Sequence, residues 1–208
     1  PMWLSYCYAY LGLFHQAIGT LDYYCRLAIE RSDRSLSTTL RAVLGILLAS
    51  LRKNKESSFH LSGAYQQAEK SGNALAKYFS LGGMAFHHLS EGRFSEARQY
   101  LMKALETGSK AGLVKQYASP IVLESFYVFH DQGIELRPDL SFPSELVRIL
   151  KEPNIHLRGV ALRLKAQDEL KHDGNLESIQ KDLKLSAEYL LQSGDPIQLA
   201  KTRLEQTR

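Results

Sequence analysis

The stretch "EGRFSEARQYLMKALETGSKAG", residues 91–112, decides the fold because it holds one complete helix between two turns. Small and apolar residues recur at i, i+4, i+7, i+8 and i+11, which places them on one face of an α-helix. We expect Gly92 and Gly112 to form the turns and Ser95 to cap the N-terminus of the helix. The residues of the shared face are Ala97, Leu101, Ala104, Leu105 and Gly108.

The same pattern recurs when the sequence is aligned with itself at an offset of 40, without any gap. Some aligned positions keep a small residue, which lets two helices approach closely, and others keep an apolar one. A single helical hairpin cannot bury its apolar faces, so neighbouring hairpins must stack on it. The aligned sets are Ala17, Ser57, Ala97; Leu21, Leu61, Leu101; Ser5, Gly45, Ala85, Ser125; and Tyr6, Ile46, Phe86, Phe126.

The repeat predicts an all-α chain of antiparallel helical hairpins, an α-solenoid. Neither end has the polar outer face of a terminal repeat, which favours a fragment of a longer protein, with partner binding at the open ends as the alternative. The predicted units are hairpins at about 1–36, 37–76 and 77–116, an irregular unit at 117–154, a hairpin at 155–194 and a partial sixth unit at 195–208.

The fourth unit departs from the repeat. Its first helix is expected from about Ser119 to about Gln132, after which "GIELRPDLSFPSEL" replaces the tight turn. Pro138 and Pro143 predict an extended connection, because proline cannot continue a helix from within. Ser144 is the expected cap of a short helix that follows.

The array is expected to resume after Pro153. Gly174 and Gly194 have the same spacing as Gly92 and Gly112, and they predict the two turns of a fifth hairpin. Asp195 is the expected cap of a last helix and Pro196 its first residue, where proline is tolerated.

These residues resemble a tetratricopeptide (TPR) unit, with Gly92 and Phe94 at the turn and Ala97 at the start of the second helix. Leu44 and Gly45 match the Leu-Gly pair of the first helix in that motif. The period of 40 exceeds the usual TPR period of about 34. The longer unit is similar to the TPR-like arrays of large bacterial transcription regulators of the maltose-activator, LuxR and sigma-54 ATPase-linked types.

The resemblance implies a right-handed superhelix that serves as the interaction region of a transcriptional or signalling regulator, with an attached effector domain. HEAT and armadillo repeats have a period near 40 as well. A kinking proline in the first helix would favour HEAT repeats, and the chain has no proline between Pro1 and Pro120.

The composition is that of an ordinary soluble protein, with 44% hydrophobic and 23% charged residues among 208. No apolar run approaches the ~18 residues that span a bilayer, and no signal peptide is expected. Lysine and arginine are scattered, apart from "RKNK" at 52–55, which argues against direct nucleic-acid binding. Cys7 and Cys25 are expected to be buried free thiols in a reducing cytoplasm.

No pattern in the sequence indicates catalysis, a metal site or a cofactor. His87 and His88 are adjacent and point about 100° apart on a helix, so they cannot chelate one ion together. HExxH, GxSxG and P-loop motifs are absent. The chain is therefore expected to be non-catalytic, with no cofactor and no metal.

In TPR arrays the first helices line a concave groove, and the resemblance carries this role to one set of positions. An apolar groove suits a protein or peptide partner, or a second copy of the chain. The alternative is an inducer-sensing domain, which would show a polar and aromatic pocket beside the irregular segment 131–153. The candidate groove residues are Tyr6, Tyr10, Ile46, Ser50, Phe86, Ser90 and Phe126.

Overall fold

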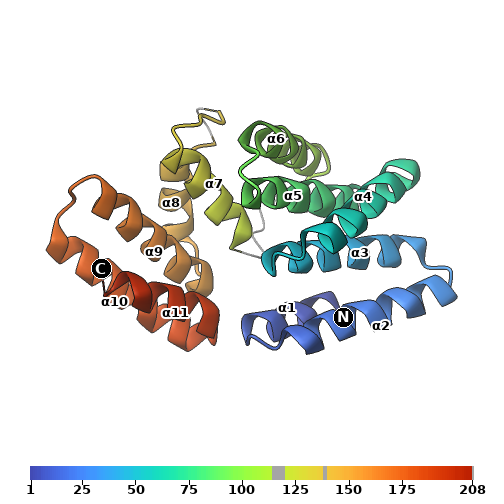
Figure 1. Cartoon of the computed structure of the whole chain (residues 1–208), viewed down its shortest axis with the longest axis horizontal. Coiled ribbons are helices and arrows are strands. Elements are labelled where there is room, and N and C mark those ends of the chain that lie inside the picture. Colours follow the sequence, from blue (N-terminus) through green and yellow to red (C-terminus); the bar gives the residue numbers. More distant parts are fainter. Residues whose placement is uncertain (114–119, 138–139, 208) are drawn as a thin grey trace. The chain divides into compact units, whose positions relative to one another are not determined.

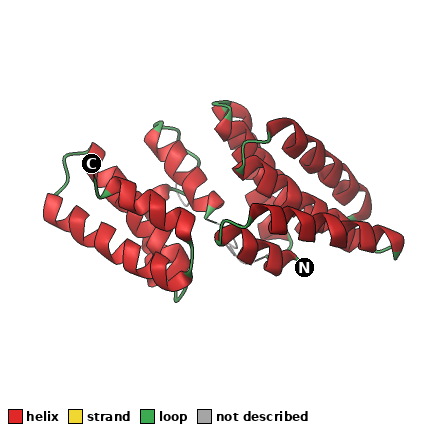
Figure 2. Cartoon of the chain, turned by 60° about the horizontal axis from the view of Figure 1, so that its bottom comes forward, coloured by secondary structure: helices red, strands yellow, loops and turns green. Residues whose placement is uncertain are grey.

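The computed structural model describes residues 1–113, 120–137 and 140–207 (Figure 1). These residues form eleven α-helices and contain no strand, and only a single isolated bridge joins Arg137 and Leu140 (Figure 2). The predicted all-α class is therefore confirmed. The chain divides into two compact units: unit 1 comprises 1–9 and 13–116, and unit 2 comprises 10–12 and 117–208.

Unit 1 is built from antiparallel hairpins that contact one another in chain order. Helix α2 packs on α3, α3 on α4, α4 on α5 and α5 on α6, and α3 also packs directly on α5. That last contact joins the first helices of two successive hairpins. The helices are α1 (Met2–Tyr10, whose last residue falls in unit 2), α2 (Phe14–Glu30), α3 (Arg34–Ser50), α4 (Asn54–Ser71), α5 (Ala74–Ser90) and α6 (Phe94–Lys110).

The helix bounds follow the predicted repeat period. Helices α3 and α5 begin at Arg34 and Ala74, ahead of the predicted unit starts at 37 and 77. The reason is capping: the side chains of Asp33 and Asn73 accept hydrogen bonds from the backbone N–H groups of Leu36 and Ala76, at 2.9 and 3.0 Å. Such side chains satisfy N–H groups that have no partner within the helix.

The turns that follow helices α1 to α6 recur at even intervals, each with one residue in the left-handed region. In the turn before α6, Gly92 has φ of 72° and the N–H of Arg93 donates to the carbonyl oxygen of His88 at 2.9 Å. Arg93 occupies the cap position and Ser95 lies inside α6, so the predicted capping role of Ser95 is wrong. The left-handed residues are Gly12, Ser32, Arg52, Gly72, Gly92 and Gly112.

Small residues bring the helices of unit 1 together, as the aligned columns predict. A Cβ atom on Gly45 would lie 2.7 Å from Cγ of Leu61, and one on Gly83 would lie 2.5 Å from Cδ2 of the same leucine. Leu61 of α4 therefore packs between α3 and α5 and is fully buried. Ala17, Ser57 and Ala97 of one aligned column are also fully buried.

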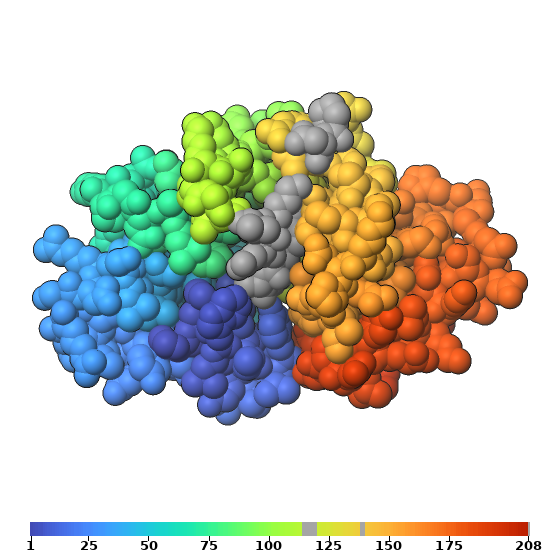
Figure 3. Space-filling view, turned by 180° about the vertical axis from the view of Figure 1, so that it is seen from behind, coloured from blue at the N-terminus to red at the C-terminus, as the bar shows by residue number. Residues whose placement is uncertain are grey.

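Unit 2 contains the irregular unit and the fifth hairpin. Helix α9 packs on α8 and on α10, α10 packs on α11, and α7 contacts both α8 and α9. The space-filling view of one face shows neighbouring helices of each unit in contact at the surface (Figure 3). The helices are α7 (Ile121–Asp131), α8 (Phe142–Lys151), α9 (Ile155–Lys171), α10 (Leu176–Ser193) and α11 (Pro196–Glu205).

Two predicted caps of unit 2 have different outcomes. The cap of α8 is Ser141, and Ser144 lies at the third helical position, where its hydroxyl accepts from the N–H of Ser141 at 3.1 Å. The two serines therefore form a reciprocal capping box instead of a single cap. Asp195 caps α11 as predicted, because it accepts from the N–H groups of Ile197 and Gln198.

The turn between α9 and α10 also differs from the prediction. Asp173, with φ of 54°, is its left-handed residue, and Gly174 is not. Gly174 is required for another reason, since a Cβ there would lie 2.8 Å from Cβ of Glu169. Ser119 and Pro138 lie outside the described residues.

Candidate functional site

Three of the predicted groove residues are buried in helix packing. Ile46 packs on α5, where a Cβ on Gly83 would lie 2.8 Å from its Cγ1. Tyr6 is buried on α1, and burial raises the pKa of its phenol well above the ordinary value. Phe126 is only 1% exposed on α7. The side chains of these residues stabilise the hairpins and offer little surface to a partner.

The predicted serines lie at helix ends. The hydroxyl of Ser50 donates to the carbonyl oxygen of Ile46 at 3.1 Å, and that of Ser90 donates to the carbonyl oxygen of His87 at 2.7 Å. These bonds satisfy carbonyl groups in the last turn of each helix. Tyr10, the last residue of α1, is partly buried.

Phe86 is different, because it belongs to a partly exposed apolar stripe along α5. The stripe residues recur at i, i+4, i+7, i+11 and i+14, one helix face. A Cβ on Gly82, in the middle of the stripe, would meet nothing within 4 Å, so the surface there is open. We call Leu75, Phe79, Gly82, Phe86 and Leu89 the α5 stripe.

The equivalent positions on α3 carry no such surface. One repeat period earlier, the α5 stripe falls on Ser35, Thr39, Ala42, Ile46 and Ala49, and the last four are at most 8% exposed. The groove predicted for unit 1 therefore reduces to the stripe on α5.

A charged pocket of about 580 Å³ lies between the ends of α4, α5 and α6. Lys77 contacts Glu69, and this hydrogen bond raises the pKa of the lysine. Lys110 binds Glu106 at 2.7 Å. These two ion pairs neutralise four of the charged side chains that line the pocket. The pocket therefore has no strong electrostatic preference for a ligand of one charge.

A second pocket, of about 490 Å³, lies beside the irregular segment of unit 2. We call it the aromatic pocket. Its wall combines the inner side of α7, the chain from Gly133 to Arg137 and the start of α8. Phe126, Phe129 and Phe142 contribute rings that are at most 2% exposed.

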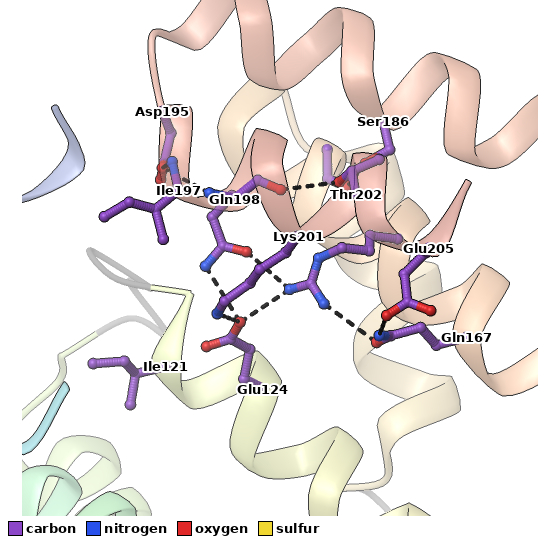
Figure 4. A network of polar contacts seen from close by, with 12 residues as sticks. Ile121, Glu124, Gln167, Ser186, Asp195, Ile197, Gln198, Lys201, Thr202 and Glu205 are labelled. Carbon is purple, nitrogen blue, oxygen red and sulfur yellow. Dashed lines mark hydrogen bonds and ion pairs between the residues drawn. The ribbon is translucent and has the colours of Figure 1, made fainter. Parts of the chain in front are cut away.

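Polar side chains of α7, α9 and α11 form the most extensive buried contact of unit 2, which we call the Glu124 network (Figure 4). Oε1 of Glu124 accepts from Nη2 of Arg163 at 2.9 Å and from Nζ of Lys201 at 2.8 Å. Gln198 bridges the two partners: its amide donates to Glu124 at 3.2 Å and accepts from Arg163 at 2.8 Å. Arg163 is only 3% exposed.

The network holds the carboxyl group of Glu124 in its ionised form. Burial raises the pKa of Glu124, but Lys201 and Arg163 lower it by more, so the net shift is downward. Arg163 also donates to Gln167 at 3.2 Å, and Gln167 donates to Glu205 at 2.6 Å. The network joins α7, α9 and α11, which are the first helices of successive units. We assign it a structural role.

The Glu124 network was not predicted from the sequence. Its signal was an arginine inside the apolar run "GVALRLKA" of α9, with Glu124 placed 39 residues earlier, close to the repeat period. A charged residue within an apolar helix face needs a partner of opposite sign.

The histidines and cysteines converge on no site. His87 is buried, and the His88 ring stacks on Tyr100 with centroids 5.0 Å apart. Within the described ranges, no group of three His, Cys, Asp or Glu could hold a metal ion. Cys7 is exposed, which contradicts the expected burial, whereas Cys25 is partly buried and its thiol lies 3.6 Å from the carbonyl oxygen of Ser37.

None of the helices in the described part of the chain is long and apolar enough to cross a membrane. Comparisons of the chain with family models, with curated proteins and with solved structures gave no match.

Proposed function

We propose that the chain is a non-catalytic interaction module that binds a protein or peptide through the α5 stripe. Its hairpins would continue as a right-handed, TPR-like superhelix. The even spacing of the turns and the direct packing of α3 on α5 support this arrangement, because stacked first helices generate a continuous surface.

The observation that carries the proposal is the α5 stripe itself. Phe79 and Phe86 are partly exposed on either side of Gly82, where a methyl group in place of the glycine hydrogen would meet no neighbouring atom within 4 Å. A gap between two rings accepts an apolar side chain from outside. An amphipathic helix presents such side chains at the same i, i+3, i+4 and i+7 spacing.

The setting we propose is a bacterial transcriptional or signalling regulator in the cytoplasm. There the module would transmit partner binding to an effector domain through the packing between hairpins. Leu61, held between Gly45 and Gly83, is an example of the tight contact that such transmission needs.

The proposal is tested by selecting amphipathic peptides against the chain from a displayed library and measuring their Kd by fluorescence anisotropy. Gly82→Leu fills the gap without removing any packing atom and should weaken binding by at least ~10-fold. Phe86→Ser should do the same. Tyr23→Ser, which alters a 56% exposed aromatic residue of α2, is the control and should leave Kd unchanged.

Circular dichroism melting of each variant separates lost binding from lost folding. If no selected peptide depends on Gly82 or Phe86, the α5 stripe is not the binding surface and the proposal fails.

A further inference from the structure

A charged residue of α3 stands where the next repeat has a core residue. Helices α2 and α4 are the second helices of successive hairpins, and both pack on α3. In the next repeat, Leu81 of α5 lines the charged pocket between the helix ends and is only 1% exposed. One period of 40 earlier, the same position on α3 is Arg41. The repeat therefore places a guanidinium group where it next places an apolar side chain.

The guanidinium of Arg41 is positioned by two residues of α4 that lie one turn apart. Its Cζ lies 5.0 Å from the centroid of the Phe59 ring, in a cation–π contact. A Cβ atom on Gly63 would lie 2.5 Å from Nη2 of Arg41, so the missing side chain leaves room for the guanidinium. Phe59 is itself 67% exposed. We call Arg41, Phe59 and Gly63 the Arg41 site.

This guanidinium has no carboxylate partner. Among the residues that the structure describes, none forms a hydrogen bond or an ion pair with Arg41. None of its nitrogens is buried, so water reaches them. The two acids whose charges act on the neighbouring His60 are each paired with another cation. These pairs are Asp22 with Arg26 at 3.2 Å and Glu56 with Lys53 at 3.8 Å.

The titratable neighbours of Arg41 supply no negative charge either. Burial lowers the pKa of His60, and Arg41 lowers it further, so the imidazole is neutral at pH 7. Burial raises the pKa of Cys25 on α2 by more than Arg41 lowers it, so the thiol stays protonated. In unit 2, by contrast, Arg163 binds Glu124 at 2.9 Å. Arg41 is thus a positioned, accessible cation that the described part of its own chain does not neutralise.

We propose that the Arg41 site binds an acidic side chain, aspartate or glutamate, of a protein partner. The fork of the guanidinium can donate two parallel hydrogen bonds to one carboxylate. The exposed ring of Phe59 offers an apolar contact to the residue beside that acid. Because the site is open, a free small acid would leave most of its surface in water, whereas a partner chain is also held by the contacts of its neighbouring residues.

The Arg41 site and the α5 stripe use different faces of the first helices. Ala42 is the counterpart of Gly82 in the stripe, and adjacent residues of a helix point about 100° apart. The Arg41 site therefore does not depend on the proposal for the α5 stripe, and either one can fail without the other.

The test titrates acetyl-Leu-Glu-Phe-amide into the whole chain and follows two NMR signals, the Nε–H of Arg41 and the backbone amide of Gly63. Both should shift and saturate. The matched peptide with glutamine in place of glutamate should bind at least ~10-fold more weakly, because a neutral amide accepts weaker hydrogen bonds. Acetate and inorganic phosphate should also bind at least ~10-fold more weakly, because neither reaches the Phe59 ring.

Arg41→Leu installs the residue that the next repeat carries as Leu81 and should abolish binding at the Gly63 signal. Arg203→Leu removes the same charge from an exposed position of α11 and is the control. If circular dichroism shows that Arg41→Leu lowers Tm, Arg41→Lys replaces it. Lysine keeps the charge but loses the fork, and it should weaken binding as well. Phe59→Ser should weaken the peptide and leave acetate unchanged.

Equal affinity for the glutamate and glutamine peptides would overturn the proposal, as would unchanged binding in Arg41→Leu. Tighter binding of inorganic phosphate than of the glutamate peptide would make this an anion site of another kind and would also refute it. So would the absence of any shift at Arg41 and Gly63 up to the solubility limit of the peptide.

Discussion

The hydroxyl of Ser57 donates a 2.9 Å hydrogen bond to the carbonyl oxygen of Gly45, and Leu61, one turn further along α4, lies directly over the same glycine. Unit 2 repeats this arrangement with other residues. Ser186 of α10 donates to the carbonyl oxygen of Gly159 at 2.7 Å, and a Cβ on Gly159 would lie 2.7 Å from Cγ of Leu190. In both units a serine and a leucine of the second helix fix the close approach of the first.

Gly45→Ala is therefore expected to destabilise unit 1. The new methyl would overlap Leu61 in a fully packed site, and overpacking of this kind costs about 1–3 kcal/mol. The matched control is Gly82→Ala, also inside a first helix but with open space around its Cβ position. Alanine should stabilise there by up to about 1 kcal/mol, because it favours helix more than glycine does. Urea unfolding followed by circular dichroism measures both; equal effects of the two substitutions would contradict the packing described.

Arg52→Gly is expected to stabilise the turn between α3 and α4. Arg52 has φ of 56°, in the left-handed region, whereas the equivalent turn positions 12 and 92 carry glycine. Relief of this strain gains about 1 kcal/mol, reduced by the greater freedom of glycine in the unfolded chain. Lys53→Gly, at a residue with φ of −82°, should destabilise instead. Urea unfolding measures both variants. A loss of stability in Arg52→Gly would contradict the left-handed geometry of this turn.

Glu124→Leu is expected to destabilise unit 2 by about 3–5 kcal/mol, because it leaves the guanidinium of Arg163 buried without a negative partner. The double variant Glu124→Leu with Arg163→Leu should recover part of this loss, since neither charge then remains unpaired. Glu106→Ala breaks a solvent-exposed pair with Lys110 and serves as the control, with a much smaller effect on stability. If the double variant loses as much free energy of unfolding as the two single variants together, the two side chains are not coupled.

Unit 1 should lose stability as the pH falls from 7.5 to 5.5. Burial lowers the pKa of His87 below its ordinary value of 6.5, as it does for His88, where Arg93 and His87 lower the pKa further. The unfolded chain therefore binds protons first, so stability falls as the pH drops through 6.5 and stops falling below the folded pKa. His87→Leu should flatten this dependence. His15→Leu, at an exposed position of α2, should preserve it. A steeper profile in His87→Leu would reverse the assigned sign.

The repeat was predictable because packing between hairpins demands the same residue sizes at a fixed interval. Leu21, Leu61 and Leu101 share one column and are all at most 3% exposed. The turns followed as well, since glycine at 12, 72, 92 and 112 marks positions that need positive φ.

Cap positions and surface exposure were harder to predict. Ser95 fits the composition of a cap, but the backbone turn at Gly92 starts α6 one residue before it. Ile46 and Phe86 occupy the same aligned position, yet their exposure differs. Ile46 on α3 is covered by α5, whereas Phe86 lies on α5 itself and is partly exposed. Periodicity tells which residues share a face, whereas exposure depends on which neighbour covers that face. The contacts of Glu124 are likewise set by tertiary packing.

The most direct test of the central proposal is photo-crosslinking of a selected amphipathic peptide to chains that carry p-benzoylphenylalanine at a single position. Replacement of Phe86 places the reactive group in the α5 stripe, and replacement of Tyr23 places it on the exposed face of α2. We predict that the peptide crosslinks at position 86 and not at position 23, and that excess unlabelled peptide removes the product. Crosslinking at 23 with none at 86 would contradict the proposal.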